Sequence, residues 1–198
     1  MTRRYEYDSE FWDAYASGNE SRYDAGFAGR VAYTAGALHC ASVLEVGCGT
    51  GIDLRLLPRN VRACGLDPNS GAVAAARNDT PSANLAMGMI TDMPFADSSV
   101  DLVFTHRLLN YLDEETLSDG MHEMYRVAAK YVMSCEWFGE REDVMDGRRR
   151  LRNMAGRWAG MDAEVVADAP IHAADHGEWE GRQADTRLTL VRVEPGGS

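Results

Sequence analysis

Val43-Leu44-Glu45-Val46-Gly47-Cys48-Gly49-Thr50-Gly51 is the stretch that decides the fold. Residues 43–46 form a short, largely apolar run, which is typical of a strand buried in a parallel sheet. The run enters a turn with glycine at every second position, and glycine permits backbone conformations and close approaches that other residues do not. Residues 52–57 then predict a short helix. The order of strand, glycine turn and helix predicts an α/β fold that binds a ligand at the turn.

Further apolar segments continue this alternation. Strands are expected at 61–66, 85–89, 100–105, 131–135 and 186–193, and helices at 69–77 and 114–127. Asn69 and Ser70 are residue types that cap a helix, and the nearly continuous apolar character of 100–105 suits a strand buried on both faces. The pattern predicts a mostly parallel sheet of seven strands with helices on both faces, and a ligand at the carboxyl ends of the strands.

The chain length of 198 residues fits one domain. Residues 1–40, rich in aromatic residues, Ala and Gly, are expected to form a helical cap, and 41–198 the core. Tyr5, Trp12 and Tyr15 are expected to close over the ligand as a lid, with ordinary packing as the alternative. The polar, arginine-rich stretch 139–161 is expected to be an insertion on the substrate side.

Composition limits the classes of partner and compartment. The formal net charge is −11 at pH 7, which disfavours nucleic acid because its binding depends on Lys and Arg neutralising phosphates. No stretch reaches the roughly 18–20 apolar residues of a membrane span, and the first ten residues are charged where a signal peptide is apolar. A cytoplasmic monomer or homodimer without membrane contact is expected.

The four cysteines stand singly, without the paired spacing of zinc or redox motifs. We therefore expect reduced, mostly buried thiols and no metal site.

The spacing of the three glycines separates two kinds of nucleotide-binding fold. Dinucleotide-binding turns normally read G-x-G-x-x-G, whereas the third glycine here comes one residue sooner. The pattern E-x-G-x-G-x-G resembles motif I of the class I methyltransferases, which implies a Rossmann-like fold, S-adenosylmethionine as cofactor and S-adenosylhomocysteine as product. By this resemblance Glu45 lies beside the ammonium end of the cofactor's methionine, and the glycines allow close approach to the backbone. An ordinary tight turn is the alternative.

Two further acidic segments extend the resemblance. Asp67 follows the second strand at roughly the 20-residue offset from Glu45 at which such folds bind ribose hydroxyls; a solvated Asp before Pro68 is the alternative. The segment Asp92-Met93-Pro94-Phe95 resembles motif II, which implies that Asp92 accepts from the adenine amino group while Met93 and Ile90 wall the ring. The implied cofactor residues are Glu45, Gly47, Cys48, Gly49, Gly51, Asp67, Pro68, Asp92, Met93 and Thr105.

Candidates for proton transfer follow the fourth and fifth expected strands. A hydroxyl or ammonium acceptor needs a general base, for which His or a carboxylate is the usual choice. His106 is the first candidate, against a surface or helix-capping histidine. Glu136 is the second, against an exposed acid at a strand end. Many related small-molecule enzymes carry a histidine near Tyr111, so Tyr111 is expected to orient the acceptor instead.

Arginines predict the charge of the acceptor. Arg149 and Arg150 belong to a basic cluster at 148–157, and Arg107 follows the fourth strand. Guanidinium groups bind carboxylate or phosphate bidentately, so the three arginines are expected to hold an anionic acceptor. A solvated helical face balanced by neighbouring acids is the alternative.

The runs 122–127 and 130–138 carry a narrower resemblance, to the methylases associated with pseudaminic acid biosynthesis, which extends over 43–157. It implies a small soluble acceptor, derived from a sugar or an amino acid and methylated on O or N. Two alternatives stay open: a protein or peptide methyltransferase, and a non-catalytic partner protein that binds S-adenosylmethionine.

Overall fold

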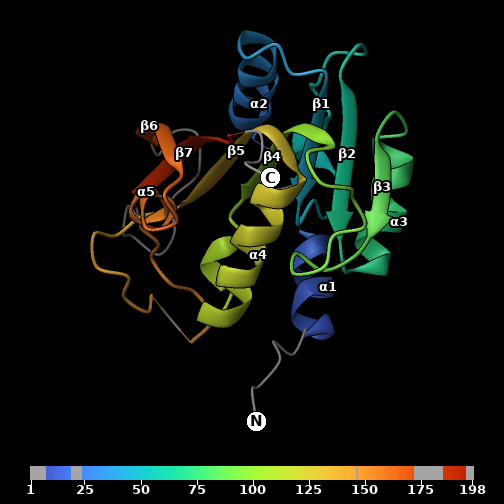
Figure 1. The fold of residues 1–198 in the computed structure, drawn as a ribbon. Coiled ribbons are helices and arrows are strands. Elements are labelled where there is room, and N and C mark those ends of the chain that lie inside the picture. The colour runs from blue at the N-terminus through green and yellow to red at the C-terminus, as the bar shows by residue number, and fades with distance from the viewer. Residues whose placement is uncertain (1–7, 19–23, 146, 172–184, 195–198) are drawn as a thin grey trace.

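A seven-stranded sheet in the order β3-β2-β1-β4-β5-β7-β6 organises the chain (Figure 1). The computed structural model describes residues 8–18, 24–145, 147–171 and 185–194. The first five strands in that order are parallel, and β7 runs antiparallel to both β5 and β6, which confirms the predicted sheet. The strands are β1 (Ser42–Val46), β2 (Arg62–Asp67), β3 (Asn84–Met87), β4 (Val100–His106), β5 (Ala128–Trp137), β6 (Glu164–Ile171) and β7 (Thr186–Arg192).

Helices begin where side chains satisfy the free backbone N–H groups of the first turn. Asp24, Asn69 and Asp113 accept such bonds at the starts of α2, α3 and α4. Among the described residues, no helix has the length and apolar character needed to cross a bilayer. The helices are α1 (Ser9–Ser17), α2 (Ala25–Ala37), α3 (Ser70–Asp79), α4 (Glu114–Val127) and α5 (Met154–Ala159), with the short 3-10 helices η2 (Ile52–Leu54) and η3 (Leu109–Tyr111).

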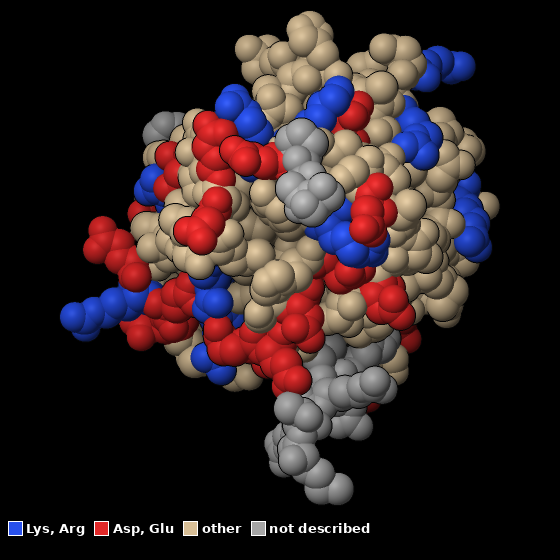
Figure 2. Space-filling model, viewed as in Figure 1, with Lys and Arg blue, Asp and Glu red and all other residues tan. Residues whose placement is uncertain are grey.

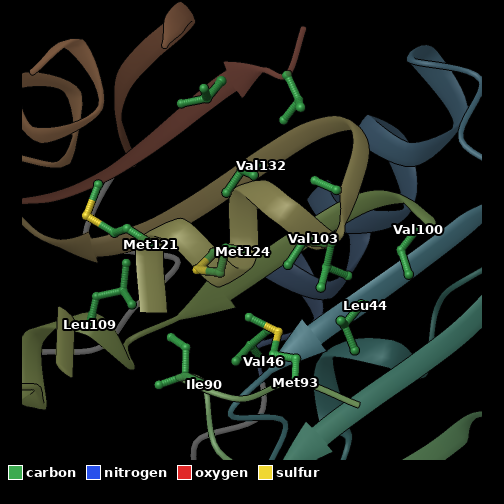
Figure 3. Packing of buried hydrophobic residues seen from close by; sticks show 14 of the residues in the cluster. Leu44, Val46, Ile90, Met93, Val100, Val103, Leu109, Met121, Met124 and Val132 are labelled. Carbon is green, nitrogen blue, oxygen red and sulfur yellow. The ribbon is translucent and has the colours of Figure 1, made fainter. Parts of the chain in front are cut away.

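Two apolar cores hold helices against opposite faces of the sheet, because successive side chains of a strand point to opposite sides. On one face, Leu44 and Val46 pack in a cluster with Met121 and Met124 of α4 (Figure 3). The other face is packed under α2 by Phe27, Val31, Val43 and Phe104. Helices on both faces are thus confirmed, and both layers leave the carboxyl ends of the strands accessible.

The predicted helical cap of residues 1–40 consists of two helices with different environments. α2 is a core helix, since Phe27, Ala28, Val31 and Ala35 are fully buried. α1 contains no buried residue and lies at one end of the strands (Figure 1). Of the two helices, α1 is therefore the one that carries the residues of the predicted lid, Trp12 and Tyr15. Tyr5, the third residue of that prediction, lies outside the described residues.

β6 has no counterpart in the sequence prediction. Its residues alternate weakly, include Pro170, and are exposed or half-buried except Ile171. As an edge strand it pairs only with β7 and buries little apolar surface, so its sequence carries little strand signal.

The surface is predominantly acidic, as the net charge requires. Figure 2 shows Asp and Glu side chains gathered in the lower part of one face, where α4 lies, with Lys and Arg scattered elsewhere. This face offers no continuous run of cations of the kind that binds a phosphate backbone.

Arg152 fastens the arginine-rich stretch to the domain. Its side chain is fully buried, its guanidinium donates to the carbonyl oxygens of Leu109 and Leu112, and it forms an ion pair with Glu114 of α4. Arg157 pairs with Glu114 as well. These two arginines of the basic cluster therefore have structural partners.

Replacing Arg152 with Ala is expected to lower the free energy of unfolding by about 3–5 kcal/mol, because it leaves buried carbonyl groups without their donor. Arg157→Ala is the matched control, and we expect it to cost about 1 kcal/mol or less because its ion pairs are partly solvated. Urea denaturation followed by tryptophan fluorescence measures both. Equal losses in the two variants would contradict the structural role of Arg152.

Candidate functional site

A cavity opens at the carboxyl ends of the parallel strands, beside the glycine turn. Its volume, with the open mouth included, is about 780 Å³. The walls come from the glycine turn, the end of β2, the loops after β3 and β4, and the helix α1. Its lining includes Trp12, Gly47, Gly49, Asp67, Ile90 and His106.

The glycine turn needs glycine at each of its three positions. Gly47, Gly49 and Gly51 have φ angles of 76°, 50° and 73°, in the left-handed region that favours glycine. A Cβ atom on Gly47 would also lie 2.9 Å from a methyl carbon of Leu108. Small residues at this turn therefore bring the backbone to the edge of the cavity.

Asp67, the last residue of β2, holds the turn in place. One carboxylate oxygen accepts from the backbone N–H of Gly49 at 2.9 Å, and the other accepts from the N–H of Asn69 at 2.8 Å. Burial raises the pKa of Asp67, while these two backbone bonds oppose the increase because they favour the carboxylate. The carboxylate lines the cavity with lone pairs that can also accept bonds from a ligand's hydroxyl groups.

Four of the predicted cofactor residues line the cavity: Gly47, Gly49, Asp67 and Pro68. Within the described part of the chain, the other six lie behind or beside its walls. Glu45, Cys48 and Thr105 are buried, Gly51 packs near Thr80 at the end of α3, Asp92 is exposed, and Met93 is buried in the core.

Met93 differs from the expected adenine wall because its segment is tied to α4. Its backbone N–H donates to Glu123 at 3.0 Å, and its side chain packs toward Leu44 and Val46 (Figure 3). Ile90, the other expected wall, does line the cavity. The motif II resemblance therefore places the right loop at the cavity but not this side chain.

α1 contributes Trp12, Tyr15 and Ala16 to the lining. Its Asp13 accepts from the side-chain amide of Asn69 at 2.7 Å, next to Asp67. The aromatic richness of the amino-terminal residues was the only sequence signal for this wall. Sequence reasoning missed Asn69 as a lining residue because it was identified only as a helix cap.

His106 lines the same cavity at the end of β4. Its Nδ1 lies 2.7 Å from a carboxylate oxygen of Asp53, a buried residue of η2 that sequence reasoning did not single out. Its ring stacks on Phe27 with centroids 3.8 Å apart. The histidine is thus a fixed, half-buried group rather than a mobile surface residue.

Glu45 lies close to Asp53 without lining the cavity. Complete burial, followed by the nearby carboxylates of Asp53 and Asp67, raises the pKa of Glu45 well above its usual value. Burial and the neighbouring carboxylates therefore both disfavour the charged form of Glu45.

Glu136, the second base candidate, is sealed inside the protein with 2% of its surface exposed. It accepts from the hydroxyl of Thr105 at 2.9 Å and, more weakly, from the backbone N–H groups of Leu108 and Asn110 at 3.4 Å. Burial raises the pKa of Glu136 to about 7, although these hydrogen bonds favour the carboxylate and act to lower it. This geometry makes Glu136 an organiser of the loop after β4, and it does not line the cavity.

Because of Glu136, the free energy of unfolding is expected to fall as the pH rises toward 7. The folded pKa of about 7 exceeds the usual 4.5, so the contribution is complete below pH 4.5 and is lost as pH rises through the folded pKa. A shift of this size corresponds to about 3 kcal/mol.

Glu136→Gln removes the titrating group and should flatten this dependence in urea denaturation between pH 5 and 8. Exposed Glu140→Gln is the control and should keep the wild-type slope. Parallel curves for wild type and Glu136→Gln would mean that this carboxyl does not titrate in the range.

An aromatic cluster with arginines adjoins the cavity. Tyr111 of η3 packs against Trp12 and against Trp137 at the end of β5, with ring centroids 5.1 and 6.0 Å apart. The guanidinium groups of Arg107 and Arg149 each lie 5.3 Å from the Trp137 ring centre, at cation–π distance. Burial raises the pKa of Tyr111, whereas the positive charges of Arg149 and Arg107 lower it. The Tyr111 hydroxyl and the two guanidinium groups therefore lie near one another.

A second hollow of about 660 Å³, including open solvent, lies beside the first. The two share Trp12 and Leu112 as walls. Tyr111, Arg148 and Arg150 line the second hollow, and Arg148 pairs with Asp8 at 2.8 Å. Tyr111 and Arg150 thus meet at this hollow, whereas Arg107 lines the first cavity and Arg149 lies over Trp137.

Comparison with known proteins agrees with the glycine turn and the sheet. Residues 43–130 match the protein family described as Methyltransferase domain. Over 190 residues, 24% are identical to a malonyl-(acyl-carrier protein) O-methyltransferase of Herminiimonas arsenicoxydans, covering 87% of this chain and 72% of that protein. Over 100 residues, 32% are identical to a protein of Mycolicibacterium smegmatis named as an S-adenosylmethionine-dependent methyltransferase, covering 49% of this chain and 38% of that protein.

The chain is an S-adenosylmethionine-dependent methyltransferase. A solved complex of a methyltransferase with the Trm112 activator of Haloferax volcanii has the same fold, with a TM-score of 0.66 at 22% identity over 96% of this chain and 97% of that one. Since the family match begins at Val43, it contains both the glycine turn and Asp67 of this methyltransferase.

The four cysteines are free and buried, and burial raises the pKa of the Cys40 thiol to about 11.

Proposed function

We propose that this methyltransferase methylates a small anionic metabolite on O or N, with the cofactor in the first cavity and the acceptor in the second hollow. The observation that carries the proposal is the shared wall of Trp12 and Leu112, which makes the two hollows immediate neighbours. Methyl transfer requires such proximity, because an in-line displacement depends on holding donor and acceptor together.

The residues of the first cavity fit the cofactor. The positive-φ glycines bring the main chain to its edge, and the Asp67 carboxylate retains lone pairs for two ribose hydroxyls. Trp12, Tyr15 and Ile90 supply apolar surface for the adenine and the methionine chain. When bound, S-adenosylmethionine supplies a methyl group already activated by its sulfonium.

Arginines support an anionic acceptor. Arg107 and Arg149 flank Trp137, and Arg150 lines the second hollow. In a protein with a net charge of −11, this local gathering of cations favours an anion on that side. The Herminiimonas relative is named for O-methylation of a malonyl group, which also carries a carboxylate. A sugar- or amino-acid-derived acid, as in the pseudaminic acid resemblance, meets the same requirement.

Loss of Asp67 is expected to weaken cofactor binding. Asp67→Ala should raise the dissociation constant of S-adenosylhomocysteine about 10- to 100-fold, because hydrogen bonds to a charged group contribute more than neutral ones. Isothermal titration calorimetry measures the change, and exposed Asp119→Ala is the control. Unchanged affinity in Asp67→Ala would remove the ribose role, and no binding by the intact protein would overturn the cofactor site.

Acceptors are sought with a panel of sugar acids, amino-acid derivatives, sugar phosphates and malonyl thioesters, assayed by release of S-adenosylhomocysteine. With an acceptor in hand, Arg149→Gln and Arg150→Gln should raise its KM about 10- to 100-fold while the affinity for S-adenosylhomocysteine stays within a few-fold. Arg141→Gln, exposed on the same stretch as Arg149, is the control. Unchanged KM in both variants would contradict an anionic acceptor held by these arginines.

A further inference from the structure

Trp12 is the aromatic side chain at the boundary between the two hollows. It lines both of them, and among the described residues Leu112 is the other one that does so. With the cofactor in the first cavity and the acceptor in the second hollow, the methyl group crosses between them beside these two residues. Reacting atoms are held about 3–3.5 Å apart for such a transfer. The sulfur that carries the methyl group therefore belongs next to Trp12 and Leu112.

Three neighbouring rings fix the orientation of the Trp12 indole. Its centroid lies 5.0 Å from that of Phe11, 5.4 Å from that of Tyr15 and 5.1 Å from that of Tyr111, with interplanar angles of 77°, 70° and 65°. Such edge-to-face pairs are favourable because the positive edge of one ring meets the negative face of another. The indole is therefore held in place although α1 contains no buried residue.

The first cavity offers little negative charge to a cation. Asp67 is the one acid among the described residues that line it, and both of its carboxylate oxygens already accept backbone N–H groups. Arg107, which also lines the cavity, is itself a cation. The electron-rich face of an aromatic ring attracts a cation without carrying a formal charge, and tryptophan does so best. Trp12 is thus the side chain at the boundary that suits a positive charge.

We infer that the indole of Trp12 binds the sulfonium of S-adenosylmethionine and so distinguishes the cofactor from its product. The inference rests on the proposed function, because it requires the acceptor on the far side of Trp12. S-adenosylhomocysteine lacks both the methyl group and the positive charge at sulfur, so the same ring contributes less to its binding. Trp12 is therefore a specificity-determining residue that favours exchange of the product for fresh cofactor.

Asp113 is the competing partner for the sulfonium. It lines the second hollow next to Leu112, and one of its carboxylate oxygens accepts from the backbone N–H of Thr116 at 2.8 Å. Asp113 does not line the first cavity, and it is exposed to water, which weakens its attraction for a charge. Asn is as favourable as Asp at the start of a helix, so Asp113→Asn removes the charge and keeps the cap of α4.

Isothermal titration calorimetry with S-adenosylmethionine and with S-adenosylhomocysteine separates recognition of the charge from packing. Trp12→Leu should raise the dissociation constant of S-adenosylmethionine about 5- to 30-fold more than that of S-adenosylhomocysteine, because only the former is a cation at sulfur. Trp12→Phe keeps a ring and should have a smaller effect than Trp12→Leu. An analogue with an ammonium group in place of the methylated sulfur should follow S-adenosylmethionine in both variants.

Phe11→Leu and Asp113→Asn are the controls, and both should keep the wild-type ratio of the two dissociation constants. Phe11 contacts Trp12 but lines only the second hollow. Equal losses with both ligands in Trp12→Leu, or a loss of discrimination in Asp113→Asn, would overturn the inference. The proposed function would then still stand on the methylation of an acceptor, whereas failure of the wild type to bind either ligand would overturn both.

Discussion

The structure depends on a half-buried carboxylate that joins two loops at the carboxyl ends of the strands. Asp67 accepts one backbone N–H from the glycine turn after β1 and another from the start of α3. Asn69 then caps α3 and donates to Asp13 of α1. A single charged group at the end of β2 therefore sets the relative positions of the turn, the helix and the aromatic wall. Burial opposes its charge and raises its pKa, and the two backbone donors offset part of that effect.

Glu136 has the corresponding role on the other side of β4. Its carboxylate gathers the N–H groups of the loop that carries η3, and there the side chain of Asn110 bonds to the backbone of Trp137 and Arg150. These bonds position the ring of Trp137, over which Arg107 and Arg149 lie. Acidic residues in this protein thus organise the loops around the cavity.

The arginines divide into two groups that differ in their partners. Arg152 and Arg157 are held by Glu114 and fasten the arginine-rich stretch, whereas Arg107 and Arg149 stack on Trp137. Residue type and spacing do not distinguish the groups. The difference arises because Glu114 lies at the start of α4, far away in sequence but adjacent in the fold.

The sequence by itself determined the strand and glycine turn at 43–51, the sheet class and the bounds of α4, because periodicity and glycine spacing are local properties of the chain. The helix expected at 52–57 is only the 3-10 turn η2 at 52–54. The cofactor followed from the resemblance of the glycine turn to motif I of the class I methyltransferases. It also placed Asp67, since the offset from the turn follows from the length of one βα unit. Only the tertiary structure decided that Met93 turns into the core, that Glu136 is sealed, and that Trp12 separates two hollows. It alone brought Asp53 to His106, because η2 and the end of β4 are neighbours only when β1 and β4 pair, and no local pattern records a contact between residues 53 positions apart.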